Sequence, residues 1–340
     1  MCVEPFKDCV RRLVSDDVSE EPVSCLISDA VSHFTQAVAE SLKLPRIVLR
    51  TAKTRLEDPV VELPPLKVKD LPMINTLNIE SFSQFVDELV STTKASSGLI
   101  WNTFEDLEHS SLATLSQQFS VPIFPIGPIH KHNLAIPSRS SSLLAEDQTS
   151  IPWLNTQPPK SVVYVSFGSI VAISKQEFLE IAWGLAKSEQ PFFLSRRGHI
   201  VKWAPQQEVL AHKSVGAFWT HNGWNSTLES VSEGVPTICM PCFSDQKVNA
   251  RFVSQVWKAG LQLENGKLER GEIEKIIRKL MMREQEGDEI RVRVSELKEK
   301  ADKCLKQGGS SYESLERLVS HIFSLETFTC HSQRPVRTVI

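Results

Sequence analysis

Short apolar runs alternate with segments of helical periodicity from the start of the chain. Residues 23–28 and 46–49 are apolar runs of strand length, and the apolar positions of residues 31–42 between them recur at helical spacing. A strand, a helix and a second strand entered through Pro45 form the repeating unit of a parallel sheet. Asp29 follows the first strand, so we expect it at the edge where open α/β sheets bind ligands.

The alternation continues along the chain and restarts once. Residues 131–150 contain SRSSS and few large apolar side chains, which is typical of a linker. We therefore predict one domain over residues 1–130, a linker over 131–150, a second domain over 151–315 and a C-terminal tail over 316–340. The further expected elements are strands at 99–102, 121–126, 161–166, 191–194, 199–201 and 215–220, and helices at 81–91, 110–119, 174–187, 270–283 and 287–307.

Two connections are shorter than this alternation requires. Parallel strands need a crossover of about a dozen residues or more, yet residues 195–198 alone separate the apolar runs at 191–194 and 199–201. Either these two strands form a hairpin, or a helical segment has been lost. A similar compression follows Leu49, where a strand runs directly into TAKTRLEDP.

The composition narrows the class of partner. The chain has 340 residues, of which 41% are apolar and 23% charged, and this suits two globular domains. A net charge of -3 gives no electrostatic reason to expect nucleic acid or an anionic membrane. No apolar run reaches the roughly 18 residues that cross a bilayer, and the start lacks the apolar core of a signal peptide. We expect a cytoplasmic monomer with reduced cysteines that binds a small molecule.

Residues 203–246 concentrate a strand, a glycine turn, a helix start and polar side chains. Gly223 permits a sharp turn, and a helix that begins near Ser226 presents its first N–H groups and the positive end of its dipole. This geometry binds phosphate, and His221 and Asn225 add side-chain donors. The stretch therefore predicts a nucleotide-sugar pocket.

Each of these residues also has an ordinary structural interpretation. Ser226 and Glu229 fit the S-x-x-E capping box, in which Glu229 only closes the helix start, although a carboxylate there could accept both hydroxyls of a ribose. Trp203 is either a core aromatic or a flat face for a nucleobase. Asp245 and Gln246 form either a helix N-cap or a pair that binds neighbouring sugar hydroxyls.

The motifs of this stretch, taken together, resemble a known signature. W-A-P-Q, H-x-G-W-N-S-x-x-E, G-V-P and D-Q, spread over 44 residues, resemble the signature box of the plant family 1 UDP-sugar glycosyltransferases. The resemblance extends to LISDA, PIFPIGP and the turn at residues 167–169, and it is greatest with the branch that glucosylates small hormones such as cytokinins. It implies an α/β fold of two Rossmann-like domains that face each other (GT-B type), with the donor in the C-terminal domain and an incomplete amino-terminal domain.

The resemblance also implies the chemistry. The expected reaction is an inverting, UDP-glucose-dependent glucosyl transfer to a small apolar acceptor, a hormone or a secondary metabolite, with UDP-glucose as co-substrate and with neither cofactor nor metal. Trp203 would stack on uracil beside Ala204 and Gln206, and Glu229 would bind the ribose. The expected diphosphate contacts are Ser169, His221, Asn225 and Ser226 around Gly223, and the expected sugar contacts are Trp224, Asp245 and Gln246.

The catalytic pair of the family is a histidine that removes the acceptor's proton and an aspartate that orients it, and Asp29 matches the aspartate. In the family the histidine precedes the segment aligned with Met1, and His33, the histidine nearest Asp29 in the chain, fits a packing residue. We therefore expect a shortened glycosyltransferase, which could be a splice form, an incomplete gene model or a decaying paralogue.

Two other functions remain as alternatives. A nucleotide-sugar binder without catalysis would follow from the missing base. A dinucleotide oxidoreductase is disfavoured because no G-x-G-x-x-G follows a strand. Cys239 and Cys242 form a C-x-x-C without a second pair, so we expect buried strand cysteines rather than a zinc or redox site.

Overall fold

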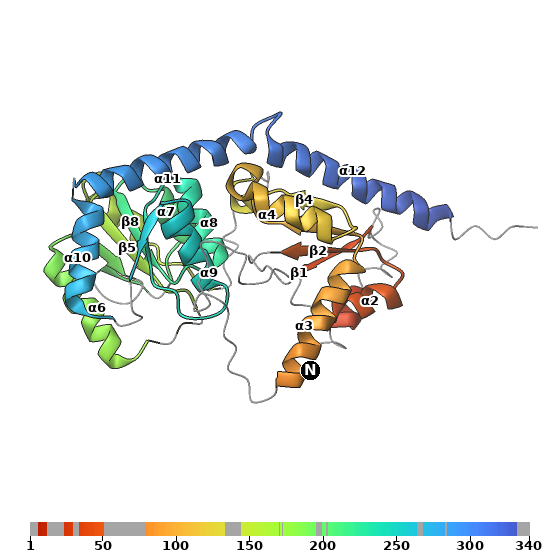
Figure 1. Cartoon of the computed structure of the whole chain (residues 1–340), viewed down its shortest axis with the longest axis horizontal. Coiled ribbons are helices and arrows are strands. Elements are labelled where there is room, and N and C mark those ends of the chain that lie inside the picture. The colour runs from red at the N-terminus through yellow and green to blue at the C-terminus, as the bar shows by residue number, and fades with distance from the viewer. Residues whose placement is uncertain are drawn as a thin grey trace, which may run out of the picture. The chain divides into compact units, whose positions relative to one another are not determined.

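The chain forms two compact units (Figure 1). The computed structural model describes residues 6–11, 24–29, 34–50, 79–132, 144–169, 171, 173–194, 199–201, 203–263, 268–282 and 284–331. The first unit comprises the described parts of Met1–Thr51, Thr76–Lys131 and Lys303–Ile340, and the second unit those of His132–Asp302.

The first unit is built on a four-stranded parallel sheet in the order β1-β2-β3-β4. Its strands are β1 (Leu26–Asp29), β2 (Arg46–Arg50), β3 (Gly98–Trp101) and β4 (Ile123–Pro125). Its helices before the second unit are residues 6–11, α2 (Thr35–Ser41), α3 (Ile79–Lys94), α4 (Glu105–Gln118) and the 3-10 helix η3 (Ile129–Lys131). Asp29 is the last residue of β1 and lies at the carboxyl edge of the sheet, as predicted.

The two faces of the first sheet are buried by different helices. Leu99 and Trp101 of β3 pack with side chains of α3 and α4, whereas Ile100 packs in the core that includes Leu318 of the C-terminal helix. This alternation follows from the two-residue period of a strand. Both faces are apolar, as parallel sheets require.

The C-terminal helix α12 (Ser310–His331) lies beside β4 (Figure 1). The Ser311 hydroxyl donates to the carbonyl of Gly127 over 2.6 Å, and the His321 ring lies 2.7 Å from the carbonyl oxygen of Ser97. The prediction of a C-terminal tail from residue 316 is therefore wrong. The apolar residues of α12 cover a sheet whose strands lie far earlier in the chain. The periodicity of a helix does not indicate which distant sheet it packs against.

The second unit holds a six-stranded parallel sheet in the order β7-β6-β5-β8-β9-β10. The strands are β5 (Val162–Ser166), β6 (Phe192–Leu194), β7 (His199–Ile200), β8 (Val215–Thr220), β9 (Thr237–Cys239) and β10 (Gly260–Gln262). Counted in chain order from β5, this is the 3-2-1-4-5-6 order of a Rossmann fold. The carboxyl ends of β5 and β8 therefore flank the point where the strand order reverses, which is where such sheets bind ligands.

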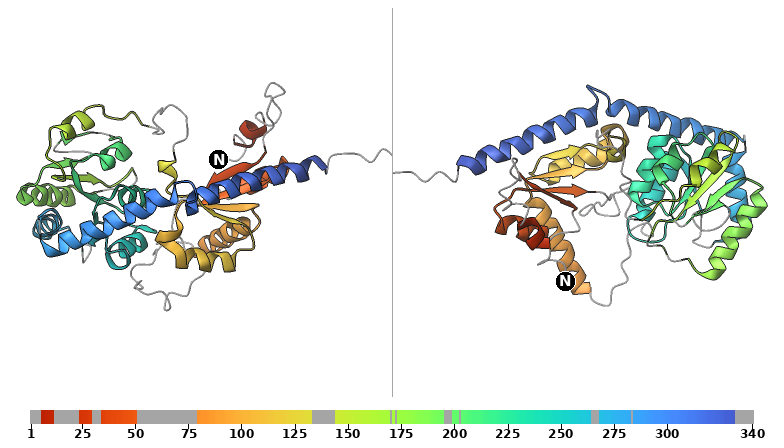
Figure 2. Two further views of the ribbon diagram at one scale, coloured as in Figure 1. Left: turned by 90° about the horizontal axis from the view of Figure 1, so that it is seen from above. Right: turned by 180° about the vertical axis from the view of Figure 1, so that it is seen from behind.

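Helices cover both faces of the second sheet (Figure 2). Val163 and Val165 of β5 pack in one core with residues of α6 and α10, while Val162 and Tyr164 pack in another with residues of α5 and α7. The helical elements of this unit are α5 (Ser150–Asn155), α6 (Lys175–Ser188), α7 (Gln206–Ala211), α8 (Trp224–Glu233), α9 (Gln246–Arg251), the π-helix η4 (Phe252–Val256), α10 (Arg270–Met281) and α11 (Gln285–Cys304).

The short connection after β6 does not form a hairpin. β6 and β7 are parallel neighbours, with Phe193 opposite His199, so the hairpin alternative is wrong. Residues 195–198, which connect the two strands, lie outside the described residues.

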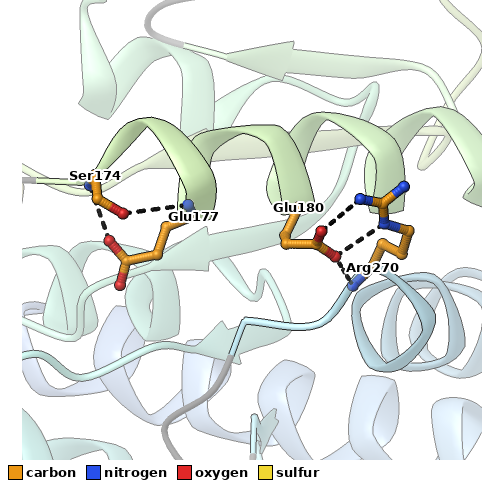
Figure 3. Close-up of polar contacts among 4 residues, drawn as sticks. All are labelled: Ser174, Glu177, Glu180 and Arg270. Carbon is orange, nitrogen blue, oxygen red and sulfur yellow. Dashed lines mark hydrogen bonds and ion pairs between the residues drawn. The ribbon is translucent and has the colours of Figure 1, made fainter.

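Helices α6 and α10 are joined at their surface and in their core (Figure 3). Ser174 and Glu177 form a reciprocal capping box at the start of α6, with bonds of 2.8 and 3.2 Å. Glu180 accepts from the backbone N–H and the guanidinium of Arg270, and these bonds lower the pKa of Glu180 to about 2. In the core, a Cβ on Gly184 would lie 2.5 Å from Ile273 Cγ2, so glycine permits the close approach of the two helices.

Candidate functional site

The turns after β5 and β8 meet at the reversal point of the second sheet. Gly168 follows β5 with a φ of 71°, and a Cβ there would lie 2.8 Å from His221 Cε1. Gly223 approaches the same ring, because its Cβ would lie 2.6 Å from His221 Nε2. The two glycines thus leave space for the His221 ring between two backbone turns, and Ser169 is exposed directly after the first turn.

The His221 ring is partly buried in this space. Burial lowers the pKa of its imidazole, while a hydrogen bond with the backbone of Ser166 opposes that shift. Nδ1 lies 3.4 Å from the Thr220 hydroxyl. Burial thus favours the neutral imidazole, and an anion placed beside the ring would favour the protonated form.

Helix α8 begins at Trp224, with Gly223 as its N-cap and no side-chain cap. Ser226 therefore lies inside the first turn and cannot be the N-cap, and the capping-box interpretation of Ser226 and Glu229 is wrong. The predicted helix start near Ser226 was two residues late. The first turn of any α-helix has N–H groups without an acceptor in the helix, and here that turn holds Asn225 and Ser226 directly after β8.

Glu229 belongs to a polar cluster instead of a cap. Gln206 Nε2 donates to Glu229 Oε2 over 2.7 Å and to Ser226 Oγ over 3.0 Å, and Gln207 Nε2 donates to Glu229 Oε1 over 3.1 Å. The buried Tyr164 hydroxyl of β5 donates to Gln206 Oε1 over 3.3 Å. Burial raises the pKa of Glu229, and the two amides oppose this by stabilising the charged form.

The segment before α7 carries the predicted base-binding aromatic. Trp203 is partly exposed, and its carbonyl accepts the N–H of Asp147 over 2.8 Å. Ala204 beside it is buried. Gln206 follows Ala204 by two residues and contacts both Ser226 and Glu229 of α8. The structure therefore brings the segment that starts at Trp203 to the same cluster as Glu229.

Asp245 and Gln246 lie at the start of α9, after β9. Gln246 Oε1 accepts the N–H groups of Cys242 and Phe243 over 2.9 and 3.1 Å, which leaves its NH₂ group as the end available for a ligand. Burial raises the pKa of Asp245, and a hydrogen bond from Asn249 Nδ2 of 2.9 Å opposes that shift.

A buried amide pair, which the sequence analysis missed, connects these two regions. Asn249 Nδ2 also donates to the carbonyl of Asn222 over 3.0 Å, so one side chain contacts both the turn after β8 and Asp245. Asn222, at a φ of 61°, donates to Cys239 Sγ over 3.3 Å. Asn249 follows Asp245 by one helical turn, and that spacing was the only signal in the sequence.

The remaining predicted residues are Cys239, Cys242, Asp29 and His33. Cys239 is buried in β9 as predicted, but Cys242 is exposed, so the prediction of two buried strand cysteines is wrong for Cys242. Asp29 is on the sheet of the first unit, whereas every other predicted site residue lies in the second unit. Its backbone pairs with Leu49, while His33 lies outside the described residues.

Within the described ranges, no cluster of three or more His, Cys, Asp or Glu side chains could hold a metal ion. No helix in the part of the chain that the structure describes is both long and apolar enough to span a bilayer. The arrangement itself offers an aromatic face, a carboxylate flanked by amides, a helix N-terminus beside a histidine, and an acid and amide pair. These groups suit, in order, a base, a vicinal diol, a phosphate and a sugar.

Known proteins are similar to this chain over most of its length. The family described as UDP-glucoronosyl and UDP-glucosyl transferase matches residues 144–305. The chain is 44% identical over 371 residues to UDP-glycosyltransferase 76C4 of Arabidopsis thaliana, a match covering 95% of this chain and 81% of that protein. It is 47% identical over 351 residues to UDP-glycosyltransferase 76G1 of Stevia rebaudiana, covering 90% and 75%.

A solved structure shows the same architecture. The structure of Phytolacca americana UGT2 complexed with UDP-2fluoro-glucose and pterostilbene is 27% identical, with a TM-score of 0.77, and the match covers 94% of this chain and 80% of that chain. The alignment with the Arabidopsis protein runs over 371 residues, more than the 340 of this chain, so that relative has extra internal segments. With the hairpin excluded, the loss of a helical segment stays the prediction for the short connection between β6 and β7.

Proposed function

Because the chain belongs to the plant family 1 UDP-glycosyltransferases and has their GT-B fold, it transfers a sugar from a UDP-sugar to a small-molecule acceptor, and we propose that this sugar is glucose. We further propose an apolar acceptor, a hormone such as a cytokinin or a secondary metabolite, and inversion at the anomeric carbon. The cluster of Gln206, Gln207 and Glu229 at the reversal point of the sheet is the observation that carries the donor site.

The nucleoside occupies the side of the site formed by α7 and α8. Uracil stacks on Trp203, which is partly exposed, beside Ala204. The ribose hydroxyls donate to Glu229, whose two oxygens already face the amides of α7. Gln206 is held between Tyr164 and Ser226, so it keeps the carboxylate in place while the nucleoside binds.

The diphosphate lies at the start of α8. Its charge is met by the N-terminus of the helix, by Asn225 and Ser226 in the first turn, and by His221 between the two glycine turns. Ser169 after β5 contacts it from the other side of the reversal point.

The glucose contacts Trp224, Asp245 and Gln246. Asp245 accepts sugar hydroxyls through its carboxylate, and Gln246 donates through its NH₂ group because its oxygen already accepts two backbone N–H groups. UDP-2fluoro-glucose in the Phytolacca relative supports glucose as the donor sugar, and pterostilbene in the same structure supports a small apolar acceptor.

The transfer is a single displacement. The acceptor oxygen or nitrogen attacks the anomeric carbon as the bond to the diphosphate oxygen breaks, and the electron pair leaves with UDP. The helix N-terminus and His221 stabilise the charge that develops on that oxygen. The acceptor's proton passes to a base, and Asp29, the last residue of β1 at the carboxyl edge of its sheet, orients that base.

A thermal shift assay tests the donor site. UDP at 100 times its dissociation constant should stabilise the folded chain by about 2.7 kcal/mol, and Trp203→Ala and Glu229→Ala should each abolish the shift. Trp183→Ala and Glu208→Ala are matched controls, because Trp183 is 52% exposed on α6 and Glu208 is exposed on α7. No shift with wild-type protein at millimolar UDP would contradict the donor site.

A transfer assay tests the chemistry separately. UDP-glucose should be preferred over UDP-galactose, and the product from a planar apolar acceptor should have the β configuration, measured by the anomeric proton coupling. Binding of UDP without any transfer would favour the alternative of a nucleotide-sugar binder. Retention of configuration would contradict the single displacement.

A further inference from the structure

Two successive glutamines at the start of α7 donate to the two oxygens of one carboxylate. Gln206 Nε2 lies 2.7 Å from Glu229 Oε2, and Gln207 Nε2 lies 3.1 Å from Glu229 Oε1. Neighbouring residues of a helix point in directions about 100° apart, so the two amides reach the carboxylate from different sides. Their amide groups therefore contact the two different oxygens of Glu229.

The two glutamines are held in different ways. Gln206 contacts Tyr164, Ser226 and Glu229, so its position is determined by three partners from β5 and α8. Gln207 is exposed, and its amide reaches Glu229 from the solvent side of α7. The bond from Gln207 therefore acts on the carboxylate and not on the core of the unit.

Because one amide contacts each oxygen, the Glu229 carboxylate can still accept the two hydroxyls of a diol. An ionised carboxylate has about four lone-pair sites, two on each oxygen. Each oxygen of Glu229 accepts one amide, so each retains one site for a hydroxyl. Vicinal hydroxyls fit two such sites when the carboxylate does not rotate, and two donors on opposite oxygens prevent that rotation.

We propose that Gln207 is a positioning residue for ribose recognition, which holds Glu229 Oε1 in the orientation that accepts one hydroxyl while Gln206 holds Oε2 for the other. This inference rests on the proposed function, because it takes Glu229 as the ribose ligand. Gln207 itself does not touch the nucleotide. Its effect is confined to ligands that present the hydroxyls.

The test compares UDP with 2′,3′-dideoxy-UDP, which lacks both hydroxyls. Gln207→Leu removes the donor but keeps the size of the side chain, and it should raise the Kd for UDP by about 3- to 10-fold, the effect of one hydrogen bond. The Kd for the dideoxy ligand should not change, so discrimination between the two ligands falls by the same factor. Gln207→Lys restores an N–H donor and should restore discrimination.

Gln285→Leu is the matched control, because Gln285 is an exposed glutamine at a helix start whose amide also lies 3.1 Å from a glutamate oxygen, that of Glu289 on α11. It should leave both Kd values unchanged. Equal weakening of both ligands by Gln207→Leu, or no weakening of either, would refute the positioning role.

Glu229→Gln, measured in parallel, distinguishes a failure of the Gln207 role from a failure of the proposed ribose site. If Glu229→Gln weakens UDP but Gln207→Leu does not, only the role of Gln207 fails. If Glu229→Gln also binds UDP like wild type, the ribose site itself fails, and with it the premise. Circular dichroism spectra and melting temperatures of all variants establish that each is folded, which the exposure of Gln207 favours.

Discussion

Alanine at Gly168 should reduce stability through backbone strain and through a contact with His221, and that contact should also weaken UDP binding. Gly168 has a φ of 71°, in the left-handed region, and there an L side chain costs about 1–2 kcal/mol. A Cβ would also lie 2.8 Å from His221 Cε1 and 3.0 Å from Nε2. These atoms are the end of a side chain that can turn aside, so the packing cost belongs at the low end of about 1–3 kcal/mol. We expect a total loss of about 2–4 kcal/mol.

Four proteins measured by urea unfolding and by titration with UDP separate the two costs: wild type, Gly168→Ala, His221→Ala and the double variant. In the His221→Ala background the ring is absent, so Gly168→Ala should cost only the backbone strain of about 1–2 kcal/mol. It should weaken UDP binding in the wild-type background, because the displaced ring no longer faces the diphosphate, but not in the His221→Ala background. Equal costs in both backgrounds would refute the contact as the cause.

Further predictions concern the helix pair, the titrating groups and one cap. Gly184→Ala should lower the free energy of unfolding by about 1–3 kcal/mol, because the added methyl overpacks against α10, and it should leave UDP affinity intact. A variant that urea unfolding shows to be stabilised would contradict the close approach of the two helices. Burial raises the pKa of Glu229, so UDP affinity should fall as the pH decreases through that raised pKa. The stability of the ligand-free chain should instead increase as the pH decreases from the raised pKa to the ordinary pKa of a glutamate. Calorimetry of Glu229→Gln should find both dependences absent, and their persistence would assign them to another group. Burial lowers the pKa of His221 and a bound diphosphate should raise it, so UDP binding near pH 6.5 should take up a proton. Calorimetry in buffers of different ionisation enthalpy measures this proton uptake, and equal uptake by His221→Asn would contradict its assignment to His221. Ser174→Ala should cost about 1 kcal/mol in urea unfolding, whereas a change of a few tenths would mean that the capping box contributes little.

The local elements of both units could be predicted from the sequence, since strands and helices leave periods of about two and 3.6 residues in the chain. The predicted strand at 215–220 coincides with β8, and the predicted helix at 174–187 differs from α6 by one residue at each end. The start of α8 was misplaced because Ser226 and Glu229 match a capping motif, while the actual N-cap is Gly223, which carries no side-chain signal.

The residues proposed for the donor site come from the sequence, and all of them except Ser169 lie within residues 203–246. The contacts within it were not. Gln207 and Glu229 are 22 residues apart and meet only because α7 and α8 lie side by side at one end of the sheet. A local pattern cannot distinguish a glutamate that closes its own helix from one that faces another helix.

The sequence by itself determined the strand and helix order, the glycines at the turns after β5 and β8, and the set of polar residues that follow them, because each of these is a property of neighbouring residues. The tertiary structure decided which of those residues meet. It places β8 beside β5, so that His221 fits between Gly168 and Gly223, and it returns α12 to the first sheet. Both outcomes depend on burying apolar faces that are far apart in the chain, and no local period records that choice of partner.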